Sequence, residues 1–443
     1  MAEKMTCGVA VVGCGTVGGA TATLLTRDAE ILRARTGLDL ELRHVVDVNF
    51  DNARRLGLDE SLFRTDLQAA LDDPGVGVVC ELIGGTSIAK TVIERALAAG
   101  KNVVTANKAL LARHGAELWA AARRAGRCIA FEASCAGGIP IIRALSDGLI
   151  ANRIDALYGI VNGTCNYILT AMTRQGQSYG EALAQAQADG LAEADPTLDV
   201  GGHDSAHKLA ILAALAFGRQ IDLDAIPVQG VDKLQLCDIQ YGNELGYTVK
   251  LLAIAQRRRT GLSLRVGPAF ISKQHPLAWV SGPFNAVSVY GHATGHTMYY
   301  GRGAGAYPTA SAVVADIASL ASGTALRAFE QLGIWPDRCE RADQLSVEEV
   351  SSRYYLRLQA EDRPGVFARV AAILGQHEIS ISSLLQHEPP EEACPQAGVP
   401  VVITTHRARE GDVRQALTHI DALDSVMGSS VCIGIVDEHP EQL

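Results

Sequence analysis

The sequence predicts an α/β chain with a doubly wound parallel sheet, followed by an α+β domain and a small ferredoxin-like domain. A glycine-rich turn joins a strand to a helix near the N-terminus, and short apolar runs alternate with helical stretches over the first third of the chain. The C-terminal part has the order βαββαβ. The 443 residues are enough for two or three domains that each bury a core.

The composition excludes several classes of protein. Hydrophobic residues make up 48% and charged residues 20%, which is not typical of a disordered chain, and the net charge of −10 argues against a protein that mainly binds nucleic acid. The longest strongly apolar stretch, Leu209 to Phe217, is too short to span a membrane, and the N-terminus lacks the pattern of a secretory signal. The 10 cysteines form no CxxC pair and indicate reduced thiols. We therefore expect a cytoplasmic protein without nucleic-acid or membrane partners.

A dinucleotide-binding motif is expected at the start of the chain. Residues 9–12 form an apolar run typical of a buried parallel strand, and a helical stretch covers residues 20–32. Between them, Gly13, Gly15 and Gly18 have the GxGxxG spacing of a Rossmann-type fold, which gives a tight turn, room for a pyrophosphate and close helix–strand packing. A glycine-rich turn that binds no ligand is the alternative. The predicted cofactor contacts are Gly13, Gly15, Thr16, Val17 and Gly18.

The cofactor preference depends on the residues after the second predicted strand, 42–46, which ends at Asp47. A carboxylate there usually accepts hydrogen bonds from the adenosine ribose, which favours NAD. Arg54 and Arg55 could instead bind the 2′-phosphate of NADP. The sequence leaves both cofactors open.

Thr86 and Lys108 are expected at the ligand-binding edge of the same sheet. Further buried strands are predicted over residues 76–82, 102–105 and 128–131, with helices between them. Ligands of such sheets lie at the carboxyl ends of the strands, and Thr86 and Lys108 follow two of these ends.

A charged segment in the middle of the chain is the predicted centre of the chemistry. A strand predicted over residues 154–161 leads into a helix that starts near Asn162. Farther on, residues 190–208 contain four carboxylates, two histidines and a lysine, and they open the very apolar helix that continues through residues 209–217. Charges at the start of a buried helix are costly unless they are paired or used.

Two pairs of residues with i,i+4 spacing lie on this helix. Asp204 and Lys208 share one face, and an exposed pair of this kind would contribute only about 0.3–0.5 kcal/mol. Because the helix is too apolar for a surface element, we favour a catalytic pair in which Lys208 gives and takes a proton. His203 and His207 are similar to part of a zinc-binding HExxH, but no third ligand is evident and Lys208 would oppose a cation.

Eight motifs follow one another in order along the chain. They are GCGTVGG at 13–19, ELIGGT at 81–86, VVTANKALLA at 103–112, FEASCAGGIP at 131–140, NGTCNYILT at 162–170, EADPTLDV at 193–200, HDSAHKLAIL at 203–212 and YYGRGAGAYPTASAVVAD at 299–316. Through these motifs the chain resembles homoserine dehydrogenase of the large, monofunctional bacterial type. The resemblance implies oxidation of L-homoserine to L-aspartate 4-semialdehyde with NAD(P)+, or the reverse, in the biosynthesis of threonine, methionine and isoleucine.

The resemblance also implies roles for the charged residues. Lys208 would be the proton donor and acceptor for the substrate oxygen, and Lys108 would bind or polarise the same region near the nicotinamide. Glu193, Asp199 and Asp204 would form an acidic site that recognises the substrate amino group or orients the lysines.

Other family contacts fall on small residues. Gly163 and Thr164 would contact the substrate, and Gly305 would touch the cofactor. Many relatives have tyrosine where this chain has Leu191, so a hydroxyl is missing on the substrate side and the affinity for substrate is expected to differ.

The Glu132 segment resembles the sodium site of the family. The ion would be held by Glu132 and by the backbone carbonyls of Cys135, Gly137 and Ile139. Oxygen ligands from a turn suit a hard cation, and a purely structural turn is the alternative.

The C-terminal part resembles an ACT domain because Asp362-Arg363-Pro364-Gly365-Val366 lies at its first strand–helix turn. This implies feedback inhibition by L-threonine, with contacts at Asp362, Gly365 and Val366; a passive dimerisation module is the alternative. The predicted elements are strands over 354–358, 379–386, 399–405 and 430–436, helices over 366–376 and 412–423, and a Pro/Glu-rich hairpin loop between the second and third strands.

Four segments follow from these assignments. They are a dinucleotide-binding domain over 1–140 with a helix that returns around 305–322, a catalytic and oligomerisation domain over 141–323, a linker over 324–350 and an ACT domain over 351–443. We expect a homodimer or a homotetramer.

Two other functions are compatible with parts of the sequence. An enzyme like aspartate-semialdehyde dehydrogenase would need a nucleophilic cysteine, for which only Cys135 is tempting, and Cys135 lacks an evident histidine partner. A sensor that binds NAD(P) and an amino acid without turnover is the non-enzymatic alternative.

Overall fold

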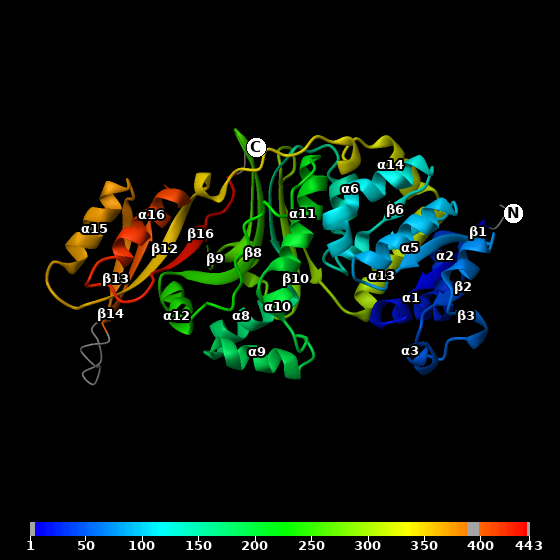
Figure 1. Cartoon of the computed structure of the whole chain (residues 1–443), viewed down its shortest axis with the longest axis horizontal. Coiled ribbons are helices and arrows are strands. Elements are labelled where there is room, and N and C mark those ends of the chain that lie inside the picture. The colour runs from blue at the N-terminus through cyan, green and yellow to red at the C-terminus, as the bar shows by residue number, and fades with distance from the viewer. Residues whose placement is uncertain (1–4, 388–397, 441–443) are drawn as a thin grey trace.

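The computed structural model describes residues 5–387 and 398–440 and places three parts in a row (Figure 1). The N-terminal part lies at one end, a mixed sheet in the middle and the C-terminal module at the other end. Most of the Pro/Glu-rich hairpin loop predicted for the C-terminal module, residues 388–397, lies outside the described residues.

The first sheet is fully parallel, in the order β3-β2-β1-β4-β5-β6, which confirms the predicted doubly wound sheet. Its apolar strands are buried because helices cover both faces. The two-residue strand β3 was not predicted, since so short a strand has no periodicity. The strands are β1 (Met5–Val12), β2 (Leu38–Val46), β3 (Phe63–Arg64), β4 (Val76–Glu81), β5 (Asn102–Thr105) and β6 (Ile129–Ala130).

The helix predicted over residues 20–32 is two helices. The first, α1 (Thr16–Arg27), starts directly after the glycine-rich turn, and α2 (Ala29–Thr36) follows Asp28. Asp28 has a non-helical backbone, with φ −103° and ψ 16°, and a short polar side chain favours such a junction. The other helices of this part are α3 (Asp51–Arg55), α4 (Leu67–Asp72), α5 (Ser87–Ala98) and α6 (Lys108–Arg124).

One helix of this layer comes from much later in the chain. Helix α13 (Ala306–Ala321) packs against α1 and against strands β1, β4 and β5 (Figure 1). The chain therefore crosses between the N-terminal part and the middle part more than once, which ties the two together.

The middle part has a sheet of five strands, against which helices pack. Strands β11, β10, β7, β8 and β9 are neighbours in that order and antiparallel. The strands are β7 (Ile154–Ile160), β8 (Tyr247–Arg258), β9 (Gly261–Ser272), β10 (Phe284–Gly291) and β11 (Gly295–Arg302). The helices are α7 (Ile141–Arg143), α8 (Gly163–Gln175), α9 (Tyr179–Ala188), α10 (Thr197–Val200), α11 (His203–Phe217) and α12 (Leu236–Glu244).

The C-terminal module has the predicted ferredoxin-like topology. Its strands follow the order β16-β12-β14-β13, with the short β15 paired to β12. Its elements are β12 (Ser351–Ala360), α15 (Val366–Gln376), β13 (Ile381–Gln386), β14 (Val399–Thr405), β15 (Ala408–Arg409), α16 (Glu410–Asp421) and β16 (Val431–Val436).

Strand β16 joins the module to the middle sheet. It is antiparallel to β12 on one side and parallel to β9 on the other, where Gly434, Ile435 and Val436 pair with residues 269–271. The two sheets are therefore one sheet of ten strands, which no local pattern in the sequence indicated.

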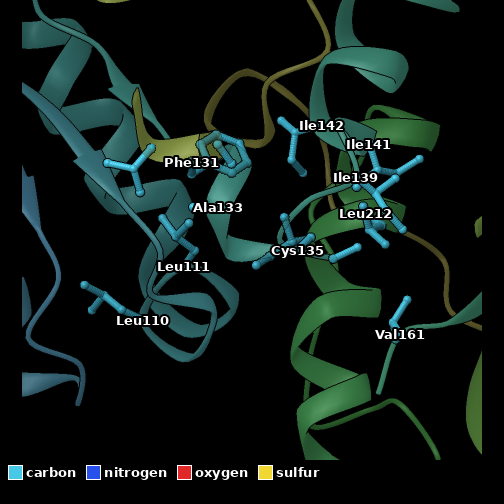
Figure 2. Packing of buried hydrophobic residues seen from close by; sticks show 14 of the residues in the cluster. Leu110, Leu111, Phe131, Ala133, Cys135, Ile139, Ile141, Ile142, Val161 and Leu212 are labelled. Carbon is cyan, nitrogen blue, oxygen red and sulfur yellow. The ribbon is translucent and has the colours of Figure 1, made fainter. Parts of the chain in front are cut away.

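The N-terminal and middle parts share one hydrophobic core. Figure 2 shows Leu111 of α6 and Phe131 on one side, Leu212 of α11 on the other, and Cys135 between them. Since α6 and α11 also pack directly against each other, burial of this apolar surface fixes how the two parts face each other.

The segment expected as a linker is packed over its first half. Helix α14 (Thr324–Gln331) is followed by Trp335, which is 6% exposed and packs against Phe131 and Phe329.

Within the described residues no single helix combines the length and apolar character of a membrane span. Only one pair of helices, Ala306–Ala321 with Thr324–Arg338, meets both criteria when taken together, and this pair is bent by 79°.

Candidate active site

Two lysines from different parts of the molecule meet at one carboxylate. Lys208 Nζ donates to Asp204 Oδ2 at 2.7 Å, within the first turns of α11. Lys108 Nζ, from the first turn of α6, lies 3.0 Å from Asp204 Oδ1. The structure thus brings together the three residues predicted to be catalytic, at the junction of the N-terminal and middle parts.

The ammonium group of Lys208 does not point into solvent. The residue is 8% exposed, and Nζ also donates to the carbonyl oxygen of Val161 at 2.6 Å. An ammonium group has three donors, so one N–H remains after these two hydrogen bonds. This geometry rules out the exposed salt bridge that was the alternative for this helix.

Asn162 connects the acidic residues and was not predicted as a site residue. Its Nδ2 donates to Asp199 Oδ1 at 2.7 Å and to Asp204 Oδ2 at 2.9 Å, while its Oδ1 accepts from the N–H of Cys165 and caps α8. The helix-start signal in the sequence marked Asn162 as a cap. Its partners across the chain depend on the tertiary fold.

The electrostatics of the network follow from burial and the two ammonium groups. Burial alone would raise the pKa of Asp204, but Lys208 and Lys108 outweigh it and hold the pKa well below its usual range. Burial lowers the pKa of Lys108, but Asp204 and then Asp199 reverse this, so that the net shift is upward. Burial and the charge of Asp204 raise the pKa of Asp199. Asp204 is therefore a fixed negative charge between two cations.

A cleft of about 380 Å³ opens in front of this network. The N-terminal sheet contributes residues 81–85, Val17 and Lys108, and the middle part contributes Asp204 from α11. Lys208 is not part of the lining, but its Nζ donates to Asp204, which is. Of the predicted site residues, the cleft is lined by Val17, Lys108, Glu193, Asp199 and Asp204.

Glu81, at the end of β4, shapes one wall of this cleft. It is fully buried, and its Oε1 accepts from the N–H groups of Ile83 and Gly84 at 2.9 and 3.2 Å. Its Oε2 accepts from the hydroxyl of Thr105 at 2.7 Å. This carboxylate holds the loop after β4 in place, a role that was not predicted from the sequence.

The glycine-rich turn has the close packing expected of a dinucleotide motif. A side chain on Gly18 would lie 1.8 Å from the carbonyl oxygen of Gly13, and Gly13 itself has φ 93°. Gly15, by contrast, faces open space. Two of the three glycines are therefore required by the fold, and the third leaves room for a ligand.

The carboxylate of Asp47 accepts hydrogen bonds from the backbone of this turn and of its own loop. Its Oδ2 accepts from the N–H of Cys14 at 2.5 Å, and its Oδ1 accepts from Val48 at 2.6 Å and Asn49 at 3.2 Å. A second cleft, of about 450 Å³, is lined by Gly15, Asp47 and their neighbours. Asp47 therefore both braces the turn and lines this second cleft.

The two arginines near Asp47 differ in their surroundings. Arg54 is paired with Glu60 at 3.3 Å and lies 3.7 Å from Asp51. Arg55 lines the second cleft and donates to the side chain of Asn52 at 2.7 Å. Of the two, Arg55 has the position from which a 2′-phosphate could be reached.

Some predicted contacts do not line either cleft. Thr86 precedes α5, next to the lining residues 81–85. Thr164 donates from its hydroxyl to the carbonyl oxygen of Leu191 at 2.7 Å, and Gly163 packs against Pro283. Gly305 directly precedes α13, with φ 127°.

The turn predicted to hold sodium is built around Glu132. This residue is 3% exposed, and its carboxylate accepts from the N–H groups of Ile142 and Arg143 at 2.8 and 3.0 Å. Burial, and next the charge of Asp316, raise the pKa of Glu132 to about 7. A nearby cation would favour the ionised form of this carboxylate.

The three carbonyls predicted to hold the ion differ in their hydrogen bonds, since Ile139 O accepts from the N–H of Ile141 at 2.8 Å. Ala136 and Gly137 both have positive φ, 53° and 39°, which curves the backbone. Among the described donors, none hydrogen-bonds to the carbonyl oxygens of Cys135 and Gly137. Within residues 5–387 and 398–440 there is no cluster of three or more His, Cys, Asp or Glu side chains suited to a metal ion, so a cation here would depend on these carbonyls.

Cys135 is a packed thiol. It is fully buried in the apolar cluster of Figure 2, and its Sγ lies 3.9 Å from the carbonyl oxygen of Lys208. Burial raises the pKa of this thiol to about 12. A nucleophilic cysteine needs a low pKa and access to substrate, so both features argue against that role.

The turn predicted to bind an effector lies at the start of α15. Asp362 is exposed and accepts from the side chain of Gln386 at 3.4 Å, Gly365 has φ 88°, and Val366 is buried. These residues belong to the C-terminal module and are not part of the cleft lined by Lys108 and Asp204.

Each of the three parts of the chain matches a known family of domains. Residues 140–318 match the family model for homoserine dehydrogenase, residues 13–132 match the homoserine dehydrogenase NAD-binding domain, and residues 354–425 match the ACT domain. The Pseudomonas aeruginosa homoserine dehydrogenase is 43% identical over 434 residues, which covers 96% of this chain and 98% of that protein.

Solved structures agree with this. The crystal structure of a homoserine dehydrogenase from Thiobacillus denitrificans has a TM-score of 0.91 and 42% identity, and the match covers 98% of each chain. A hyperthermophilic archaeal homoserine dehydrogenase in complex with NADPH has a TM-score of 0.59 and 25% identity, over 71% of this chain and 98% of that chain. The chain therefore belongs to the homoserine dehydrogenase family, as its motifs predicted, and is an NAD(P)-dependent oxidoreductase with a C-terminal ACT domain.

Proposed function

We propose that this chain interconverts L-homoserine and L-aspartate 4-semialdehyde, as a step in the biosynthesis of threonine, methionine and isoleucine. The observation that carries the proposal is the pair of ammonium groups, of Lys208 and Lys108, held by the buried carboxylate of Asp204 beside the cleft. The homoserine dehydrogenases with 37–43% identity over most of the chain support it.

Different residues of the site have different roles in the proposed reaction. Bound nicotinamide supplies or accepts the hydride. Lys208 moves the proton of the substrate oxygen through its remaining N–H, and Lys108 stabilises negative charge that develops on this oxygen. Glu193 and Asp199 give the cleft the negative charge that suits the α-ammonium group of the substrate. Gly163 and Thr164, which do not line the cleft, are proposed as further substrate contacts.

The cofactor is proposed to cross the glycine-rich turn. Gly15 lines the cleft beside Asp47, and Val17 lines the cleft beside Lys108, so the turn lies between two cavities that suit the two halves of a dinucleotide. Thr86 and Gly305 are proposed as further contacts. Because Asp47 and Arg55 both face the ribose side, NAD and NADP stay open, and kcat/KM measured with each cofactor decides between them.

Substitution of Lys208 tests the mechanism. We expect Lys208→Ala to lower kcat by about 10²–10⁴-fold, since it removes the group that transfers the proton. Turnover is followed as absorbance of the reduced nicotinamide with homoserine and NAD+ or NADP+. Lys250→Met, a change at another buried lysine outside the cleft, serves as the matched control and should retain turnover.

The same assay separates the alternatives. A nucleophilic mechanism predicts complete loss of activity in Cys135→Ala, whereas the lysine mechanism predicts measurable turnover. A purified protein that binds cofactor but gives no absorbance change with either cofactor would be a sensor, and the proposal would be wrong.

Regulation is proposed for the ACT domain. L-Threonine would bind near Asp362, Gly365 and Val366 and inhibit the enzyme. Addition of threonine to the assay tests this.

A sodium ion is proposed at Glu132 and the backbone carbonyls of Cys135, Gly137 and Ile139. Sodium chloride would then raise the Tm of the protein relative to an equal concentration of choline chloride.

The remaining assignments are also proposals. We propose a homodimer or homotetramer in the cytoplasm, which light scattering and cell fractionation test. The domain limits 1–140, 141–323, 324–350 and 351–443, with 305–322 returned to the first, are tested by limited proteolysis. The free cysteines of the described residues suit a reducing compartment.

A further inference from the structure

Glu81, at the end of β4, is a buried carboxylate without a cationic partner. It is fully buried, and no lysine, arginine or histidine of the described residues forms an ion pair with it. Its described donors are all neutral: the N–H groups of Ile83 and Gly84 bind Oε1, and the hydroxyl of Thr105 binds Oε2. Both oxygens accept hydrogen bonds, as those of an ionised carboxylate do. A buried charge without a counter-ion is costly, so its place in the fold calls for a reason.

The position of Glu81 is in the wall of the cleft proposed for the nicotinamide. Glu81 is among the lining residues, and so are Ile83 and Gly84, whose N–H groups it holds, and Lys108. In the sheet, β4 and β5 lie on one side of β1, and β2 lies on the other. A dinucleotide crosses such a sheet at β1, with its adenosine half on the β2 side and its nicotinamide half on the β4 side. The carboxylate therefore lies on the nicotinamide side.

The charges of this cleft are not balanced. Among the described residues, its lining contains five carboxylates but one lysine, Lys108. That ammonium group lies 3.0 Å from Asp204, to which Lys208 also donates. Both lysines are thus bound to a carboxylate other than Glu81. The five carboxylates are those of Glu81, Glu193, Asp195, Asp199 and Asp204.

The nicotinamide ring changes its charge in the reaction. When an aldehyde is reduced, C4 of the neutral ring gives a hydride, which is a hydrogen with two electrons, to the carbonyl carbon. The carbonyl oxygen takes up a proton, and the ring is left as a pyridinium cation. A fixed anion near the ring therefore stabilises the oxidised form relative to the reduced form.

We infer that Glu81 is the counter-charge for the oxidised nicotinamide ring. Its charge makes the protein bind the oxidised cofactor more tightly, relative to the reduced one, than it would without this carboxylate. The same difference favours transfer of hydride from the cofactor to the substrate on the enzyme. The inference rests on the position proposed for the cofactor in this cleft.

Cofactor binding to the full chain, without substrate, tests the inference. The Kd of the reduced cofactor is measured from its fluorescence, and the Kd of the oxidised cofactor from displacement of the reduced one. The pair used is NADH with NAD+ or NADPH with NADP+, whichever binds more tightly. Glu81→Gln removes the charge but keeps the size and an oxygen that accepts from Ile83 and Gly84. We expect it to raise the ratio of the oxidised to the reduced Kd about tenfold.

Asp195→Asn is the matched control. It makes the same change of charge at another carboxylate of the cleft lining, but Asp195 is exposed and accepts from the hydroxyl of Thr197 at 2.5 Å. Water and salt screen an exposed charge. We therefore expect its ratio of Kd values to equal that of the wild type.

An equal rise of both Kd values in Glu81→Gln would overturn the inference, because Glu81 would then only support the loop. An unchanged pair of Kd values, or the same change of ratio in Asp195→Asn, would overturn it too. Circular dichroism checks the fold of Glu81→Gln. If that variant does not fold, the wild type decides, and tighter binding of the reduced cofactor than of the oxidised one would contradict the inference. Turnover with homoserine is measured on the same samples, so failure of the proposed function is seen separately from the ratio.

Discussion

A single carboxylate, Asp204, organises the active site at the scale of residues. It holds Lys208 from its own helix and Lys108 from the other side of the cleft, and Asn162 links it to Asp199. The Asp204–Lys208 pair was predictable because i,i+4 spacing on an apolar helix is visible in the sequence. The roles of Asn162 and Glu81 were not, because their partners are distant in the chain or depend on how a loop folds back.

Lys250 is a buried lysine away from the cleft, and it gives a prediction about pH. It is 4% exposed, and its Nζ donates to the carbonyl oxygen of Val280 at 2.5 Å and to Asn166 Oδ1 at 3.3 Å. Burial, and next the charge of Arg174, lower its pKa to about 8. Between about pH 8 and about pH 10.4 the unfolded chain holds a proton there that the folded chain does not.

We therefore expect Lys250 to destabilise the fold below about pH 8 by on the order of 1–3 kcal/mol, and to cost nothing above about pH 10.4. Lys250→Met should have a higher Tm than the wild type at about pH 7.5, and the difference should shrink at about pH 9.5. Calorimetry at both pH values measures this. A difference that stays constant with pH would show that Lys250 keeps its ordinary pKa in the fold.

At the scale of elements, the glycine-rich turn shows what a sequence motif specifies. Its spacing predicted the strand, the turn and the helix, because Gly13 and Gly18 each meet a local steric requirement. The end of α1 at Arg27 and the extension of β2 back to Leu38 were not predicted, since caps and sheet pairing decide them. The pairing of β16 with β9 left no local signal, because it joins segments more than 150 residues apart in the chain.

The same turn gives a matched pair of substitutions. A methyl group at position 18 would lie 1.8 Å from the carbonyl oxygen of Gly13, whereas Gly15 has open space around it and φ −72°. We expect Gly18→Ala to lower the free energy of unfolding by about 1–3 kcal/mol or more. Gly15→Ala should keep the Tm and raise the KM for the cofactor. If Gly18→Ala were as stable as the wild type, the close packing of α1 on the turn would be wrong.

At the scale of the whole molecule, the outer edge of the ten-stranded sheet is exposed. Strand β11 forms this edge, and it carries Met298 and Tyr300, which are 41% and 53% exposed. Exposed edge strands with apolar side chains are typical of contact surfaces between copies of a chain. The edge therefore suits the proposed homo-oligomer.

We expect light scattering to give a dimer or tetramer for the wild type and to show dissociation for the double variant Met298→Lys/Tyr300→Lys. Two charges on this strand would have to be desolvated in a contact. Ile31→Lys, on the exposed side of α2, is the control and should leave the mass unchanged. An unchanged mass in the double variant would place the contact elsewhere.

The position of β16 also has a consequence for how the protein is made. This strand comes after every other described strand in the chain, yet it lies between β9 and β12. Until β16 has been translated, β9 and β12 each lack this neighbour. The backbone N–H and C=O groups on that side of both strands are then unpaired. The nascent protein is thus most prone to aggregate just before residues 431–436 emerge, because their pairing with β9 and β12 completes the sheet.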